Sequence, residues 1–145
     1  QHGFTSLKKL RHKEWSKAES VNHISPKMVA DAPYINEKAA ELYAILSQAH
    51  WIIGYNVDFD LRFLMGSDII TDEEYNAFRT EDVMIQFAEI YGEYSVYHED
   101  YKWQKLTTAA AYYDYDWNVK GIEAHNSLAD CFATLFVYHK ILSGE

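Results

Sequence analysis

Apolar residues recur at helical spacing over much of the chain. The clearest case is 127–142, where one stripe of apolar positions predicts a helix that packs against a core. A second helix is predicted to begin near Asn36, and a third near Asp58 that ends at Gly66. The stripe expected to be buried in the last helix contains Leu128, Cys131, Phe132, Leu135, Tyr138 and Leu142.

Shorter helices are predicted from their first residues. Ser25 followed by Pro26 is typical of a helix start, and Thr71 with Glu74 matches a capping box. Two further helices are predicted at 82–91 and 105–113.

Trp51–Tyr55 is the one segment with the pattern of a buried strand. Phe4–Leu7 alternates like a short strand, and Gly92–Trp103 is polar, rich in tyrosine and expected to be a loop. A single strand cannot satisfy its own backbone groups. Either further strands are missing from this chain or another copy supplies them. With either alternative, the expectation for the chain itself is an α/β fold in which helices dominate and the central sheet is incomplete.

The length of 145 residues fits one domain, which we place at 1–145. One cysteine, Cys131, cannot form an internal disulfide, so a reducing cytoplasm is expected. No apolar run approaches the roughly 18 residues of a membrane span, so contact with a membrane is not expected. The net charge of −9 argues against a basic surface that binds long stretches of nucleic-acid duplex. An acidic enzyme can still act on a phosphate chain if divalent cations neutralise its active-site carboxylates.

The first acidic motif follows the predicted strand. If Asp58 caps the next helix, Asp60 lies in its first turn and faces the end of the strand, where open α/β sheets gather functional groups. Asn56 can bind a ligand or stabilise the turn, and the sequence leaves both open. Phe59 and Phe63 are expected to pack together into the core.

The second acidic motif lies at the start of the last helix. On one helix, His125 and Asp130 would point roughly 140° apart, so they converge only if His125 precedes the helix. Asp130 is expected on the side lined by Ala133 and Thr134, where small side chains leave room for a cation. Alternatively, Asp130 only complements the helix dipole.

Two carboxylates and a histidine from distant segments can hold Mg²⁺ or Mn²⁺ and activate a water. This combination indicates phosphodiester hydrolysis. The sequence contains no Gly-x-Ser-x-Gly, Cys-x-x-Cys or His-Glu-x-x-His motif and no phosphate-binding glycine loop, so the chemistries that depend on them are not indicated.

These motifs resemble the DEDDh branch of the ribonuclease H-like 3′–5′ exonucleases, which includes ribonuclease T and the proofreading subunits of bacterial DNA polymerase III. Tyr55–Asp60 is similar to the second motif of the family, and His125–Asp130 is similar to the third. Ser20–Pro33 and Lys102–Leu106 are similar to two further stretches of the family, in the same order. The resemblance runs from about Phe4 to the C-terminus.

The resemblance implies a metal-dependent exonuclease that releases nucleoside monophosphates from the 3′ ends of single-stranded DNA or RNA. Asp60 and Asp130 would be metal ligands in a site that holds two Mg²⁺ or Mn²⁺ ions in the complete family. His125 would be the general base, and Asn56 and Phe63 would lie near the terminal nucleotide.

The first motif of the family, Asp-x-Glu on a leading strand, has no counterpart in this sequence. We therefore expect a ribonuclease H-like fold truncated at its N-terminus, inactive as this chain alone and prone to self-association through exposed sheet or helix faces. The alternative is a non-catalytic interaction module on a degenerate nuclease fold. Its contact surface would be the aromatic loop with Tyr91, Tyr94, Tyr97, Tyr101 and Trp103.

Overall fold

A computed structural model describes residues 19–20, 24–117 and 127–144. Helices are combined with two small sheets, which fits the predicted α/β class. In chain order the elements are η1 (Ile35–Lys38), α2 (Ala39–Gln48), β1 (Ile52–Gly54), α3 (Val57–Met65), α4 (Asp72–Ala77), β2 (Thr80–Asp82), α5 (Val83–Tyr91), β3 (Tyr94–Ser95), β4 (Asp100–Tyr101), α6 (Leu106–Tyr112) and α7 (Ser127–Ser143).

The predicted strand is present as β1, and it pairs in parallel with β2, a strand that the sequence pattern did not reveal. The register aligns Ile52 with Thr80 and Gly54 with Asp82. The chain crosses from β1 to β2 through α3 and α4, the crossover that parallel pairing requires. In the ranges that the structure describes, the sheet around β1 has these two strands, and the second sheet is the antiparallel pair β3–β4.

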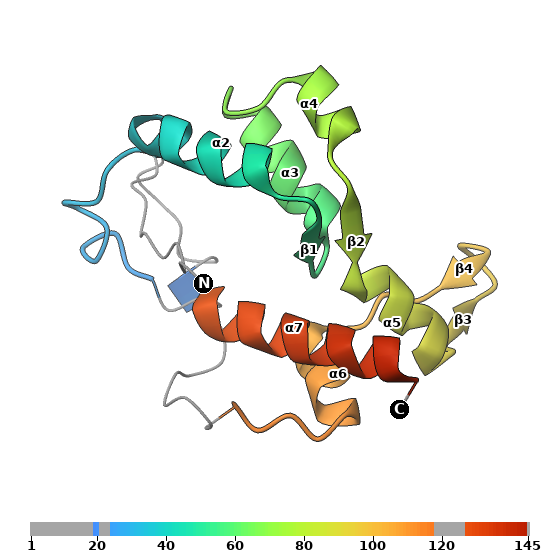
Figure 1. Cartoon of the computed structure of the whole chain (residues 1–145). Helices are drawn as coiled ribbons and strands as arrows, with labels where there is room; N and C mark the ends of the chain where they lie inside the picture. The colour runs from blue at the N-terminus through green and yellow to red at the C-terminus, as the bar shows by residue number, and fades with distance from the viewer. Residues whose placement is uncertain (1–18, 21–23, 118–126, 145) are drawn as a thin grey trace.

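The helices lie on two sides of these strands (Figure 1). On one side, α2, α3 and α4 surround a first core made of Val57, Leu61, Ile69 and Ile70. On the other side, α5, α6 and α7 surround a second core made of Val83, Phe87, Ala109 and Val137. The first core combines α3 with the segment that follows it, and the second combines α5, α6 and α7. Both helix groups therefore depend on tertiary packing as well as on helix propensity.

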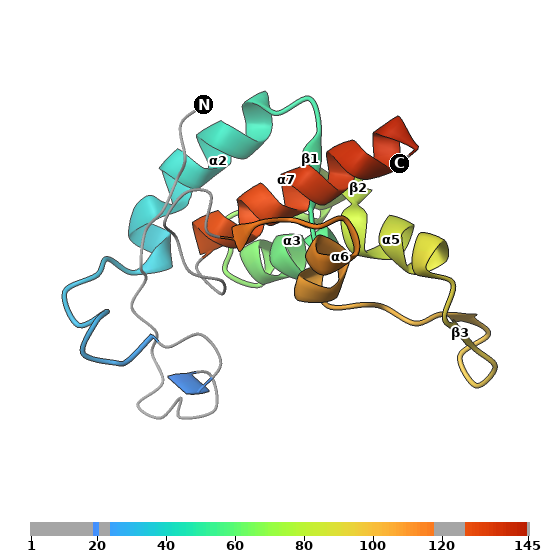
Figure 2. The same cartoon turned by 90° about the horizontal axis from the view of Figure 1, so that it is seen from below.

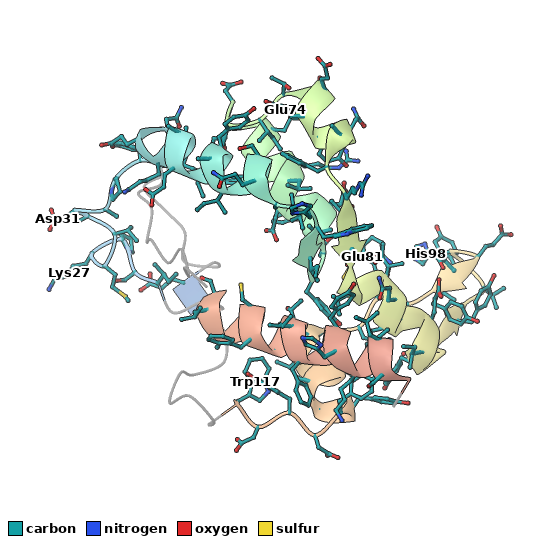
Figure 3. All side chains as sticks on the ribbon, viewed as in Figure 1. Lys27, Asp31, Glu74, Glu81, His98 and Trp117 are labelled. Carbon is teal, nitrogen blue, oxygen red and sulfur yellow. The ribbon has the colours of Figure 1, made fainter. Side chains whose placement is uncertain are left out.

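The strands β3 and β4 form a hairpin that projects from the end of α5, away from the other helices (Figures 1 and 2). The segment Gly92–Trp103 was expected to be a loop, so this expectation was wrong in part. The rings of Tyr94 and Tyr101 stack edge to face across the hairpin at 5.5 Å. His98 lies in the hairpin, and its ring contacts that of Tyr97, which is 90% exposed (Figure 3).

Helix α7 has the predicted bounds, but its fully buried positions are not those of the predicted stripe. They are Ala129, Ala133, Thr134 and Val137. Cys131, Leu135 and Leu142, which were expected in the buried stripe, are exposed, whereas Tyr138 of that stripe packs against the second core. Small side chains allow the helix to approach α5 and α6 closely, so the narrow alanine face and not the bulkier stripe covers the core.

Three other expectations about helices were wrong. Ser25 and Pro26 begin a series of turns and not a helix, with the amide of Met28 donating to the Ser25 carbonyl. Asn36 lies inside η1, and Tyr34 occupies the cap position with Glu37 completing a capping box. Phe59 and Phe63 are exposed, at 65% and 51%, because α3 turns Val57 and Leu61 toward the first core instead.

The remaining helix predictions were confirmed within a residue or two. The capping box of Thr71 and Glu74 starts α4, and Gly66 is the C-cap of α3. Helices α5 and α6 occupy the predicted ranges. Phe4–Leu7 lies outside the described residues.

Candidate functional site

The first acidic motif follows a tight turn between β1 and α3. A Cβ atom added to Gly54 would lie 2.9 Å from the Cβ of Val57, so the strand and the helix meet too closely for any larger residue. Asn56 adopts the left-handed conformation, with φ of 66°, and is the N-cap of α3. Asparagine tolerates this conformation better than most residues. The helix therefore begins at Val57, one residue earlier than predicted.

Asp58 is a surface residue of the first helical turn and not the cap that the sequence suggested. One of its oxygens accepts a bond from Arg62 Nε at 2.7 Å, and the other accepts a bond from the hydroxyl of Tyr75. The bond from Tyr75, and then that from Arg62, lower the pKa of the Asp58 carboxyl. Both oxygens of Asp58 therefore accept bonds from residues of α3 and α4.

Asp60 lies in the same turn and has different surroundings. Its side chain reaches solvent, but enough atoms pack around it to desolvate the carboxylate. This partial burial, together with the negative charge of Asp82, raises the pKa of Asp60. A carboxylate that is destabilised in this way gains from a nearby cation.

Asp82 was not singled out by the sequence analysis. It is the last residue of β2 and the N-cap of α5, and its Oδ1 accepts a bond from the amide of Met84 at 3.0 Å. Oδ1 also accepts from the amide of Asn56 at 3.0 Å, and Oδ2 accepts from the amide of Val57 at 3.1 Å. An aspartate directly before the apolar run of α5 is a cap signal, which could have identified the first of these bonds but not the other two.

Asp130 lies in the first turn of α7, half-buried, and its carbonyl accepts a bond from Thr134 Oγ1 at 2.8 Å. The next residue, Cys131, is exposed at its surface, but neighbouring atoms partly desolvate its thiol and raise its pKa. The negative charges of Asp130 and then Asp60 raise this pKa further. Helix α7 packs against β1, and α3 begins shortly after β1, so Asp130 and Asp60 belong to neighbouring elements.

The remaining predicted site residues are Asn56, Phe63 and His125. The side chain of Asn56 does not cap α3, so its role at the turn is carried by its backbone. Phe63 is half-exposed on α3, two turns of helix from the junction. His125 lies outside the described residues.

Tyr55 anchors the end of β1 to the second half of the molecule. Its hydroxyl donates to the carbonyl of Gln104 at 2.9 Å, and its ring packs against the second core. Burial and the charge of Asp82 raise the pKa of this phenol. The junction that carries Asn56 is therefore held from both sides, by Tyr55 and by Asp82.

The arrangement offers hard oxygen donors to a cation. Magnesium and manganese favour carboxylate oxygens and complete their coordination with waters and substrate phosphates, so Asp60 and Asp130 are of the required kind. Within the described ranges, no cluster of three or more His, Cys, Asp or Glu side chains could by itself hold a metal ion. A cation at this place would depend on substrate and water for the rest of its shell.

Comparisons with known proteins give one match. A family model, RNase_T, described as exonuclease, matches residues 7–138 of the chain. No curated protein and no solved structure matches. In the part of the chain that the structure describes, no helix has the length and hydropathy to cross a bilayer.

Proposed function

The chain belongs to the RNase_T exonuclease family, and on this basis we propose that it is a metal-dependent 3′–5′ exonuclease acting on single-stranded DNA or RNA. The observation that carries the proposal is the placement of two carboxylates on neighbouring elements. Asp60 lies in the first turn of α3, shortly after β1, and Asp130 lies in the first turn of α7, which packs against β1.

Asp60 and Asp130 would hold the divalent cation of this reaction. When bound, such a cation supplies Lewis acidity toward the scissile phosphate and neutralises the charge that develops on its oxygens. The positive charge would also relieve the electrostatic cost of placing Asp60 close to Asp82.

In the proposed reaction, a water attacks the phosphorus of the last phosphodiester. The bond between phosphorus and the 3′ oxygen of the preceding nucleotide breaks, and this oxygen takes up a proton from solvent, which releases a nucleoside 5′-monophosphate and leaves a new 3′ hydroxyl. We propose that His125 accepts the proton of the attacking water.

The terminal nucleotide would contact Asn56 and Phe63. The exposed ring of Phe63 offers a face on which a base can stack, and Asn56 lies beside the turn that leads to Asp60. Both side chains belong to α3 or its cap, so substrate contacts and one metal ligand would share a single element.

The experiment that tests the proposed function follows a strand labelled at its 5′ end, as DNA and as RNA, with Mn²⁺ or Mg²⁺ added. The proposed function predicts a ladder of strands shortened one nucleotide at a time from the 3′ end. The sequence-based expectation that this chain alone is inactive predicts no shortening, so the assay decides between the two. Asp60→Asn and Asp130→Asn should each lower the rate by about 100-fold or more, since each removes a charge from the site that stabilises the transition state.

Asp58→Asn is the matched control. It removes a carboxylate two residues from Asp60 that is engaged by Arg62 and Tyr75, and it should keep most of the activity. The proposed function is wrong if no shortening occurs under any of these conditions. It is equally wrong if Asp60→Asn and Asp58→Asn lose the same fraction of the rate.

A further inference from the structure

Asp82 connects the two halves of the molecule through backbone groups. It ends β2 and caps α5, so it belongs with the elements of the second core. Through the amides of Asn56 and Val57 it also holds the start of α3, whose buried residues form the first core. Asp82 pairs with Gly54 at the end of β1, and Figure 1 shows β2 leading into α5.

The bonds to α3 replace a local cap. The first N–H groups of a helix have no partner within the helix, and the side chain of Asn56 does not provide one. Asp82 provides it for the amide of Val57, from 25 positions further along the chain. Bonds from amides to a carboxylate are stronger than neutral bonds, and the N-terminal ends of both α3 and α5 favour the negative charge.

These bonds also limit what else Asp82 can do. A carboxylate has about four lone-pair sites, and the backbone occupies three of them here. Asp82 is therefore suited to hold backbone and poorly suited to bind a cation itself.

Asp60 depends on this arrangement because it lies in the first turn of α3, three residues after Val57. Asp130 lies on α7, which packs on α5 through the second core. The distance between the two carboxylates thus depends on how the start of α3 is fixed to the elements of the second core, and Asp82 makes one such connection directly to the first backbone groups of α3.

We propose that Asp82 is a positioning residue, which fixes Asp60 relative to Asp130 so that the two carboxylates bind one divalent cation. This inference rests on the proposed function. Its structural part, the clamp on the amides of Asn56, Val57 and Met84, can be measured without any nuclease activity.

The test uses Asp82→Ala, Asp82→Asn and the control Thr71→Ala. The control removes a helix cap of comparable kind on α4, where Thr71 Oγ1 accepts from the amide of Glu74 at 3.2 Å. Three quantities are measured: amide hydrogen exchange, Mn²⁺ affinity by titration calorimetry, and kcat and KM for a single strand, all at a temperature where each variant is folded.

Asp82→Ala is expected to speed exchange at the three clamped amides and to lower Mn²⁺ affinity and kcat by about 10- to 100-fold, as is usual for residues that orient metal ligands. KM for the strand should not change. Thr71→Ala should lower the melting temperature while leaving Mn²⁺ affinity and kcat as in the unaltered protein. Asp82→Asn retains an acceptor oxygen without the charge, and it should recover most of the lost affinity.

Two outcomes overturn the inference while the proposed function stands. In the first, the unaltered protein binds Mn²⁺ and Asp82→Ala binds it equally well. In the second, Asp82→Asn keeps its amides protected but loses as much affinity as Asp82→Ala, which would make the charge of Asp82 responsible. If Asp82→Ala does not fold, Asp82→Asn decides. Its remaining oxygen can still accept from the amides of Asn56 and Met84, so only the amide of Val57 should exchange faster. The loss of Mn²⁺ affinity should then be small.

A different result identifies failure of the proposed function. If the unaltered protein neither binds Mn²⁺ nor shortens the strand, the nuclease assignment is wrong and the role of Asp82 in it is wrong as well.

Discussion

The two cores of the molecule differ in how completely they exclude solvent. In the second core, Val83, Phe87, Ala109 and Val137 are all fully buried, with 0% exposure. In the first core every residue keeps some exposure, from 3% at Leu61 to 7% at Ile69. Helix α2, which covers the first core, has no buried residue, whereas α5 has four.

This difference shows where the candidate site obtains its rigidity. Asp130 stands on a helix of the well-packed core, and Asp60 stands on a helix of the looser one. Packing alone therefore fixes Asp130 better than Asp60. Connections across the junction, from Asp82 and from Tyr55, compensate for the looser packing around α3.

The largest expected effect is the loss of a buried ring in the second core. Phe87 contacts the rings of Tyr91, Tyr112 and Tyr113 at 5.7, 5.4 and 6.0 Å. Phe87→Ala should lower the free energy of unfolding by about 3–5 kcal/mol, measured by urea denaturation. Leu61→Ala in the first core should cost less, about 2–3 kcal/mol, since its surroundings can relax into the space.

A matched pair of valines separates the effect of the core from that of side-chain size. Val137→Ala in the second core should cost about 2 kcal/mol, and Val57→Ala in the first should cost less. An equal or greater loss for Val57→Ala would contradict the tighter packing of the second core.

A smaller effect is expected at the turn between β1 and α3. Gly54→Ala brings a Cβ atom to 2.9 Å from the Cβ of Val57 and 3.3 Å from its Cα, so the start of α3 must move. We expect a loss of about 1–3 kcal/mol and weaker Mn²⁺ binding. Gly66→Ala at the other end of α3 is the control, since Gly66 has a helical φ of −65° and the change should stay within about 1 kcal/mol. Equal losses for the two variants would contradict this account of the turn.

Replacing Asp60 should stabilise the protein slightly when divalent cations are absent. The pKa of Asp60 is raised in the folded state, so its contribution to stability is present below the unfolded pKa of about 3.9 and is lost as pH rises through the folded pKa. At pH 7 Asp60→Asn should therefore melt at a somewhat higher temperature than the unaltered protein. With Mn²⁺ added the order should reverse, because the metal stabilises the unaltered protein more than the variant. A lower melting temperature for the variant without metal would be inconsistent with the charge crowding at Asp60.

The smallest effect concerns Asp58, whose pKa is lowered by Tyr75 and Arg62. The sign is opposite to that of Asp60: the stabilising contribution is present above the unfolded pKa and is lost as pH falls through the folded pKa, below about pH 4. Tyr75→Phe removes the main cause of the shift and should flatten the fall of the melting temperature between pH 4 and pH 2.5. An unchanged slope would mean that the bond from Tyr75 has no influence on Asp58.

The sequence predicted those elements whose signals are local. The capping box of α4 and the glycine after α3 depend on neighbouring residues alone, and they were found within a residue. The strand β2 was missed because its three residues, Thr80–Asp82, are too short and too polar to show alternation, and it forms only by pairing with β1.

The buried face of α7 and the role of Asp82 were missed for a related reason. Hydrophobicity favoured the stripe with Leu135, but close approach of α7 to its neighbours selected the alanine face. The bonds from Asp82 to the amides of Asn56 and Val57 join segments about 25 residues apart, and no spacing in the sequence announces them. For the candidate site, the sequence nominated Asp60 and Asp130, but what places Asp60 relative to the second core required the structure.

The central claim is that Asp60 and Asp130 together hold a divalent cation at the junction of the two cores. Anomalous diffraction at the manganese edge, from crystals of the protein grown with Mn²⁺, tests it most directly. The account predicts a manganese peak in contact with both carboxylates, absent from crystals of Asp60→Asn. A peak that contacts neither residue, or no peak in a crystal of the unaltered protein saturated with Mn²⁺, would contradict it.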